Sequence, residues 1–175
     1  AWDRVIAVVV QPGVEFSNES VHEYSRKKAE PLTTALRKYP GLVFEGHSTD
    51  YQTGRGLREM VEDGIAVLKV GPALTFAMRE ALFSLAAMEK EIYNDLPEEQ
   101  SRFMEVLEEV MLSAPKNWVP YCHGDVAEIR LYRKYGFSDR VRYYMSEDRV
   151  KKAIDRLMSN LQKRPIPIMI LSQYM

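Results

Sequence analysis

In the first half of the chain, segments with a strand-like hydrophobic pattern alternate with segments with a helical pattern. Three segments carry strand signals and end at glycine, proline or polar loops: 5–10, 42–45 and 65–70. The first of them is a continuous apolar run, mostly β-branched, which is typical of a strand buried on both faces of a parallel sheet. Helical patterns fill the intervals, over 20–38, where Pro31 would kink or divide the helix, and over 57–62. This order, with short connections, predicts βαβ units and a parallel sheet.

The second half of the chain is mainly helical in pattern. Apolar residues near helical spacing predict helices at 73–96, about 97–112 and about 146–161. Pro97 suits a first helical turn, and Ser146 would be the N-cap of the last helix. Residues 113–145 are mixed and rich in Tyr and Arg.

Three strands cannot close a barrel, so two architectures stay open. The chain is either a small open α/β unit or part of a larger barrel. It begins almost directly in a strand signal and ends in the apolar 170–175. Because both ends look cut, we expect the second architecture. The last three β/α units of a barrel would then occupy 1–96, and a helical C-terminal extension packed on the barrel would occupy 97–175.

Composition narrows the classes of function. The net charge is −1, with 24 Lys and Arg against 25 Asp and Glu. Basic and acidic residues are interleaved, so no nucleic-acid surface is expected. Cys122 is the single cysteine, which excludes an internal disulfide and favours a reducing, cytoplasmic setting. No apolar run has the length of a membrane-spanning helix, and we expect no membrane contact.

Ligands of parallel α/β folds bind beyond the carboxyl ends of the strands. The loop after the second strand is the richest in chemical groups there. Glu45 and His47 are two residues apart and would face the same side, where they suit proton transfer or a divalent metal. Asp50 would orient the imidazole. The alternative is a polar turn in which His47 and Asp50 bond to backbone, and spacing alone leaves both open.

The connection after the third strand is a candidate anion site. Gly71 and Pro72 open the long helix, and free N–H groups near Ala73 and Thr75 would attract a phosphate. Such a pattern more often belongs to a strand-to-helix turn that binds no ligand. Lys69 ends an otherwise apolar strand and would form a structural ion pair, grip a phosphate or form a Schiff base.

Two arginines lie among aromatic residues near the end of the mixed segment. Arg140 and Arg142 are two residues apart, and their guanidinium groups suit phosphate. A surface or subunit contact explains them equally well. The chain has no Walker loop, dinucleotide fingerprint, paired-cysteine zinc site or nucleophile elbow.

Several long segments resemble one known family over essentially the whole chain: 8–16, 45–53, 68–77, 138–144 and 170–174. They are similar to the second half of GatZ/KbaZ proteins, described as the non-catalytic subunit of D-tagatose-1,6-bisphosphate aldolase. Older descriptions call such proteins tagatose-6-phosphate kinases, which the residues here do not support. The family resembles class II aldolases, which are zinc-dependent TIM (β/α)8 barrels. The resemblance therefore implies the C-terminal part of such a barrel, strands six to eight, with extra C-terminal helices.

The resemblance also implies functions and site roles. It implies tagatose- and galactitol-type catabolism of phosphorylated ketohexoses, by C4 epimerisation of tagatose 6-phosphate and fructose 6-phosphate through retro-aldol chemistry. The alternative is an accessory subunit that stabilises a catalytic aldolase partner in a homo- or hetero-oligomer. The expected groups are catalytic Glu45, His47, Asp50 and Lys69, and phosphate-binding Ser48, Gly71, Ala73, Thr75, Arg140 and Arg142.

A zinc-like divalent metal would be bound by Gln11, Glu45 and His47 and completed by residues outside this chain. The chain departs from the class II pattern at both expected histidine positions. Gln11 stands where a histidine followed by glycine is expected, and Glu45 ends the next strand in place of a histidine.

Overall fold

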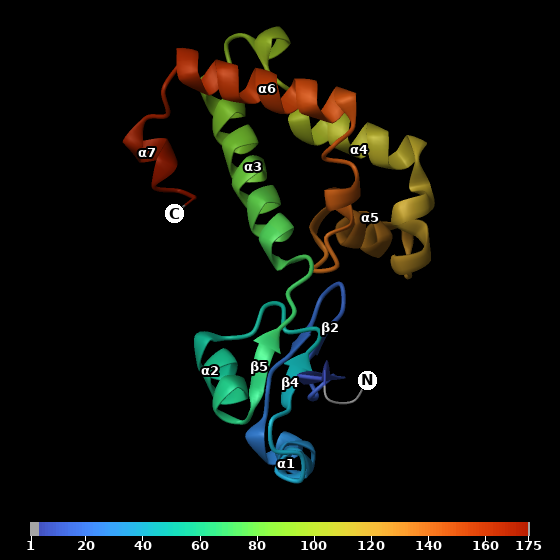
Figure 1. Ribbon diagram of the computed structural model, residues 1–175. Helices are drawn as coiled ribbons and strands as arrows, with labels where there is room; N and C mark the ends of the chain where they lie inside the picture. Colours follow the sequence, from blue (N-terminus) through green and yellow to red (C-terminus); the bar gives the residue numbers. More distant parts are fainter. Residues whose placement is uncertain (1–3, 175) are drawn as a thin grey trace. The chain divides into compact units, whose positions relative to one another are not determined.

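The structure is a computed structural model that describes residues 4–174 (Figure 1). The chain forms two compact units, Ala1–Leu74 and Thr75–Met175. Each has a hydrophobic core of its own. The pattern of elements in the sequence predicted a division at 96/97. The long helix accounts for the difference, because its apolar residues Leu82, Phe83 and Leu85 pack on the core of the second unit.

A parallel sheet organises the first unit, as predicted. Its strands β1 (Ala7–Val10), β4 (Val43–Gly46) and β5 (Ile65–Leu68) lie in the order β1-β4-β5. Val10 pairs with Gly46, and Gly46 with Leu68, so the carboxyl ends of all three strands are aligned. Helices α1 (Arg26–Leu36) and α2 (Gly54–Glu62) occupy the connections, and β2 (Glu15–Phe16) and β3 (Val21–His22) form a short antiparallel pair.

The core of the first unit lies between the sheet and its helices. Its buried members come from the loops, helices and strands together: Val14, Tyr24, Ala29, Phe44, Met60 and Ile65. The expectation that the first strand is buried on both faces is not met in this chain. Val8 and Val9, which point to opposite faces, are 39% and 56% exposed, so neither face of β1 is fully covered within the described residues. The strand also lies at an edge of the sheet.

The first helix starts later than predicted. Residues 21–22 form β3, and α1 begins only at Arg26. The buried side chain of Gln52 explains this, because its Oε1 accepts the N–H of Tyr24 (2.9 Å) and its Nε2 donates to the carbonyl of His22 (3.0 Å). These bonds hold the segment extended. Pro31 lies inside α1 without dividing it.

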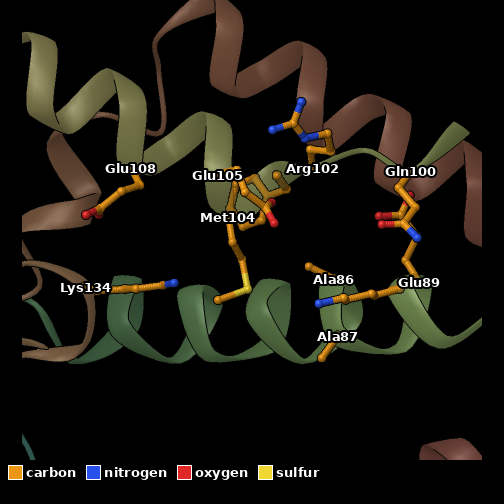
Figure 2. A pocket seen from close by; sticks show the side chains of 11 residues that line it. Ala86, Ala87, Glu89, Gln100, Arg102, Met104, Glu105, Glu108 and Lys134 are labelled. Atoms are coloured by element: carbon orange, nitrogen blue, oxygen red, sulfur yellow. The ribbon is translucent and has the colours of Figure 1, made fainter. Parts of the chain in front are cut away.

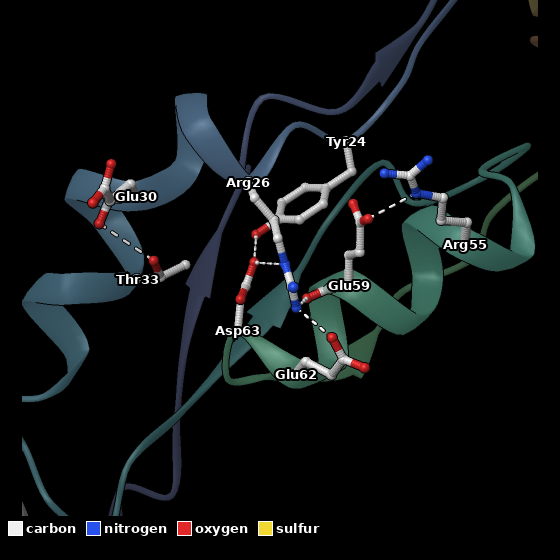
Figure 3. A network of polar contacts seen from close by, with 8 residues as sticks. All are labelled: Tyr24, Arg26, Glu30, Thr33, Arg55, Glu59, Glu62 and Asp63. Carbon is white, nitrogen blue, oxygen red and sulfur yellow. Dashed lines mark hydrogen bonds and ion pairs between the residues drawn. The ribbon is translucent and has the colours of Figure 1, made fainter.

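A polar network joins the start of α1 to the end of α2 (Figure 3). The hydroxyl of Tyr24 donates to Asp63 (2.8 Å), and Arg26 bonds to Asp63 (3.1 Å) and to Glu62. Burial of the Tyr24 hydroxyl, together with its bond to the Asp63 carboxylate, raises the pKa of Tyr24. The two helices are therefore joined by the protonated hydroxyl of Tyr24, which donates to Asp63.

The second unit is helical. It contains α3 (Ala73–Ile92) from Thr75 onward, and its other main helices are α4 (Phe103–Ser113), α5 (Val126–Tyr135), α6 (Asp148–Lys163) and α7 (Ile168–Leu171). Short 3-10 turns connect them at Pro97–Glu99, Pro115–Asn117, Val119–Tyr121 and Arg140–Tyr143. The core consists of apolar residues from α4, α6 and the segment between α5 and α6: Phe103, Leu107, Val110, Met111, Val141, Tyr144, Val150, Ala153 and Leu157. None of the helices in the described part of the chain is long and apolar enough to cross a membrane.

Three predicted helix boundaries in this unit were wrong. The 97–112 helix starts at Phe103, because the buried carboxylate of Glu89 binds the N–H of Ser101 (3.0 Å) and Arg102 adopts a left-handed conformation with φ 51°. The last helix starts at Asp148, with Glu147 rather than Ser146 at the N-cap and no side-chain cap. The first helix of the unit ends at Ile92 rather than 96.

A buried ion pair lies at the start of α3. Arg79 donates to the carbonyls of Lys134 (2.8 Å) and Tyr135 (3.1 Å), which end α5, and lies 3.4 Å from the Oδ1 of Asp139. Thr75 donates to the other carboxylate oxygen (2.6 Å). Burial raises the pKa of Asp139, against the opposing effects of the Thr75 bond and of the nearby guanidinium groups. Arg79 thus caps α5 and holds Asp139 at once.

Candidate functional site

A carboxylate and an imidazole meet at the carboxyl end of β4. Glu45 lies in β4 and His47 follows it, and the His47 Nε2 is 2.9 Å from the Oε1 of Glu45. Both side chains are about one-third exposed. The N–H of His47 donates to the carbonyl of Val10 in the neighbouring strand (2.9 Å), which anchors the histidine backbone. The structure therefore brings together the two groups that the sequence spacing placed on one side.

The rest of this loop is held by buried polar side chains. The hydroxyl of Thr49 donates to the carbonyl of Lys69 (2.9 Å), and the side chain of Thr53 caps α2 by accepting the N–H of Gly56. Gln52 binds residues 22 and 24, as described above. Most of the polar residues that made the loop look rich in chemistry are therefore occupied in fixing its shape. Glu45 and His47 remain accessible.

Asp50 has backbone partners in place of the expected imidazole. Its Oδ1 accepts the N–H groups of Gly71 and Ala73, both at 2.9 Å. This matches the alternative in which a loop carboxylate bonds to backbone. It also means that the two N–H groups expected to hold a phosphate already have an anionic partner within the chain.

The other candidate phosphate ligands belong to the second unit and have partners there. Thr75 donates to Asp139, as described above. Arg142 donates to the carbonyls of Ser138 and Asp139 and to the hydroxyl of Tyr143. The guanidinium of Arg140 lies 3.6 Å from the ring centroid of Tyr121. A phosphate role for them stays a prediction, and these contacts give each a local structural role.

Three further predicted residues lie at the strand ends of the first unit. Lys69 directly follows β5 and is exposed. The structural ion pair considered for its side chain does not occur within residues 4–174. Ser48 is half-buried and left-handed, with φ 58°. Gln11 follows β1, and its amide nitrogen donates to the carboxylate of Glu15 and to the carbonyl of Val14.

Glu15 was not among the predicted site residues. Its position four residues after Gln11 gave no periodic signal, because the turn at Gly13, with φ 81°, brings the two together.

The candidate metal ligands do not form a complete site by themselves. Within the described residues, no group of three or more His, Cys, Asp or Glu side chains is arranged to hold a metal ion. Glu45 and His47 are adjacent, but the amide nitrogen of Gln11 is directed to Glu15. Any metal at this position would need ligands from outside these residues.

A cavity of about 410 Å³ lies in the second unit, between α3 and α4 (Figure 2). Its lining mixes cations, carboxylates and apolar groups, among them Lys90, Arg102, Met104, Glu105 and Lys134. The buried Glu89 at its edge is bonded to Ser101 and to Asn160 (2.6 Å). These contacts serve packing, and no pair of reactive groups like that of Glu45 and His47 is found among the lining residues.

Comparison with known proteins agrees with the resemblance. One solved structure, described as "a probable tagatose 6 phosphate kinase from Sinorhizobium meliloti 1021", is 48% identical with a TM-score of 0.91. The alignment covers 99% of this chain and 44% of that one, so the chain spans less than half the length of that relative. The family described as "D-tagatose-1,6-bisphosphate aldolase subunit GatZ/KbaZ-like" matches over residues 1–175. The chain therefore belongs to the GatZ/KbaZ-like family.

Proposed function

We propose that the full-length protein acts in tagatose-type carbohydrate catabolism by interconverting tagatose 6-phosphate and fructose 6-phosphate at C4. The observation that carries this proposal is the accessible Glu45–His47 pair at the carboxyl end of β4. Family membership supplies the substrate class, because the family description names a tagatose bisphosphate aldolase subunit. The chain would form the C-terminal part of a longer α/β barrel, which would cover the exposed edge of β1.

The chemistry suits an imidazole held by a carboxylate. In a retro-aldol epimerisation a base removes the proton of the C4 hydroxyl, and the C3–C4 bond breaks. Its electron pair stays on C3 as an enediolate, and C4 becomes an aldehyde. Rotation about the C4–C5 bond presents the other aldehyde face, C3 attacks it, and the proton returns to the C4 oxygen. The reaction is balanced without an oxidant or reductant.

His47 is the proposed base. When its Nε2–H donates to Glu45, its Nδ1 is the nitrogen that accepts a proton. The Glu45 carboxylate would then stabilise the imidazolium that forms. The enediolate needs a cation or several hydrogen-bond donors as well. Residues 4–174 do not make up a metal site by themselves, so we assign that role to no residue here.

The test uses the full-length protein without a partner. Tagatose 6-phosphate is incubated with the protein, with and without a chelator, and fructose 6-phosphate is assayed. We expect conversion, and its loss with the chelator would indicate a metal completed outside this chain. We expect Glu45→Gln and His47→Asn each to lower kcat roughly 100-fold or more, the usual size of a general acid–base contribution.

Matched variants separate chemistry from folding. His22→Asn and Glu23→Gln change the same residue types at exposed positions of the first unit, and we expect both to keep wild-type turnover. A partly exposed ion pair of this kind contributes about 1 kcal/mol or less to stability, so the two site variants should stay folded. Wild-type turnover in both site variants would remove this loop from the mechanism.

An accessory role is the second candidate, favoured by the word "subunit" in the family description. It predicts no conversion by the protein alone. It also predicts that adding the protein to a separate catalytic aldolase subunit raises the activity or the thermal midpoint of that subunit. Conversion by the isolated protein would refute a purely accessory role.

A further inference from the structure

The carboxylate of Asp50 lies at the start of α3, although its own loop follows β4. Asp50 is 2% exposed, and its Oδ1 accepts the N–H groups of Gly71 and Ala73 at 2.9 Å each. Gly71 belongs to the connection between β5 and α3, and Ala73 is the first residue of α3, a helix of 20 residues. The free N–H groups and the dipole at the start of such a helix favour an anion. Asp50 therefore occupies the place where an external anion would bind.

The hydrogen bonds of Asp50 tie the loop after β4 to the segment after β5. Hydrogen bonds from N–H groups to a carboxylate are stronger than those between neutral groups. Thr49, the preceding residue, is also buried and donates to the carbonyl of Lys69. The loop after β4 is thus attached twice to the segment after β5. A Cβ added at Gly71 would lie 3.7 Å from an Asp50 oxygen, which is ordinary van der Waals contact.

The reactive pair lies at the other end of the same short segment. The N–H of His47 is bound to the end of β1, and Thr49 and Asp50 are bound to the segment after β5. The backbone between these anchors includes Ser48, which is left-handed, a conformation that costs free energy outside glycine. Such a conformation persists only where neighbouring contacts hold it. Loss of the Asp50 anchor would let the segment relax and move His47 away from Glu45.

We propose that Asp50 is a positioning residue, an internal anion that fixes the His47 loop on the β5–α3 connection and keeps substrate phosphate off Gly71 and Ala73. The part concerning turnover rests on the function proposed above. The part concerning the loop does not. The phosphate of the substrate is then recognised elsewhere in the full-length protein.

The kinetic experiment compares Asp50→Ala with Asp50→Asn in the full-length protein. The amide oxygen of asparagine can still accept both N–H groups, so we expect Asp50→Asn to keep most of the wild-type kcat. Asp50→Ala should lower kcat roughly 10- to 100-fold, the cost of misplacing a reactive group by about an ångström, with KM changed by less than about 3-fold. Asp63→Ala is the matched control. It removes a carboxylate bonded to Tyr24 and Arg26 in the same unit and should leave kcat unchanged.

The result that overturns the phosphate part is a lower KM in Asp50→Ala. The vacated N–H groups would then be binding the substrate phosphate. An unchanged kcat in Asp50→Ala would overturn the positioning part. If Asp50→Ala does not fold, Asp50→Ser takes its place, because its short hydroxyl leaves the two N–H groups out of reach while keeping a polar side chain.

A second measurement is independent of turnover. Hydrogen exchange of the peptides that contain residues 47–50 and 71–73 should be faster in Asp50→Ala than in wild type. Sodium formate, compared with sodium chloride at equal ionic strength, should restore protection by supplying the missing carboxylate. Unchanged exchange in Asp50→Ala refutes the tie. If the wild-type protein shows no epimerisation, the proposed function fails while the exchange result still decides the role of Asp50.

Discussion

Replacing Arg79 by methionine tests whether one buried cation organises the second unit. Arg79 is 2% exposed, and its side chain has partners on three sides. It caps the last carbonyls of α5, pairs with the fully buried Asp139, and lies 4.2 Å from the ring centroid of Phe76. Methionine keeps much of the side-chain volume and removes the charge and all donors. The variant therefore isolates the polar contribution from the packing contribution.

The expected loss of stability comes from the Asp139 carboxylate, which stays buried without Arg79. Breaking a buried ion pair by removing one partner costs roughly 3–5 kcal/mol, because the other charge stays buried and uncompensated. Removing the second charge as well, in Arg79→Met with Asp139→Asn, should recover part of this loss. We expect a coupling free energy of about 1–3 kcal/mol between the two positions.

The stability difference between Arg79→Met and wild type should change with pH in a definite direction. Burial already raises the pKa of Asp139, and Arg79 is one of the groups that lower it. Without Arg79 the folded-state pKa rises further above the unfolded value. The stability linked to this carboxyl is then fully present below the unfolded pKa and is lost as the pH rises through the folded pKa. Arg79→Met should therefore be closer to wild type at pH 5 than at pH 8, and the double variant should lose this trend.

Hydrogen exchange as a function of urea is the suitable assay, because peptides from α4 and α6 report on the second unit alone. The free energy of opening is compared among wild type, both single variants and the double variant at the two pH values. A loss below about 1 kcal/mol in Arg79→Met, which is the size expected for an exposed pair, would refute the reasoning. Additive single-variant effects would refute the coupling between Arg79 and Asp139.

Three further predictions concern the first unit and the chain as a whole. Gln52→Met should destabilise the first unit by about 2–4 kcal/mol, because it leaves the buried N–H of Tyr24 without an acceptor and the His22 carbonyl without its donor. Urea-dependent hydrogen exchange measures this loss. A change within about 0.5 kcal/mol of zero, the usual range for a surface substitution, would contradict the prediction. Tyr24→Phe should lower the stability by about 1 kcal/mol through the lost hydrogen bond to Asp63. Because the folded-state pKa of Tyr24 is raised, the extra stability of wild type is fully present below the unfolded-state pKa and is lost as the pH rises through the folded-state pKa. A difference in thermal midpoint that grows at high pH would contradict this. The 175-residue chain alone should be poorly stable because the edge of β1 is exposed, and a steep cooperative unfolding transition in circular dichroism would count against this.

Local signals predicted most of the elements of the fold. The apolar runs ending at glycine and proline located the three parallel strands, and helical spacing located α2, α3 and α6. The helix α5 could also have been found, because Asp125 and Glu128 form a capping box at its start. These features depend on neighbours within one or two turns, which is the range over which sequence patterns carry information.

The candidate site was predicted in part. The spacing of Glu45 and His47 placed the pair on one side, and the structure joins them. The sequence left open a backbone-bonded Asp50 but did not identify its partners, because both lie more than twenty residues away in sequence. Arg79 was missed for a similar reason, since a charged residue on a helix is normally expected to face solvent.

The sequence by itself determined the three parallel strands, several of the helices, the family, and the placing of Glu45 and His47 on one side. Tertiary structure decided which polar groups remain available for chemistry. Thr49, Asp50 and Gln52 are polar residues of the loop after β4, and Asp50 was predicted to be catalytic, yet each is buried and bonded to backbone from another segment. The physical reason is that a buried donor or acceptor must find a partner, and which partner it finds depends on segments that only folding brings together.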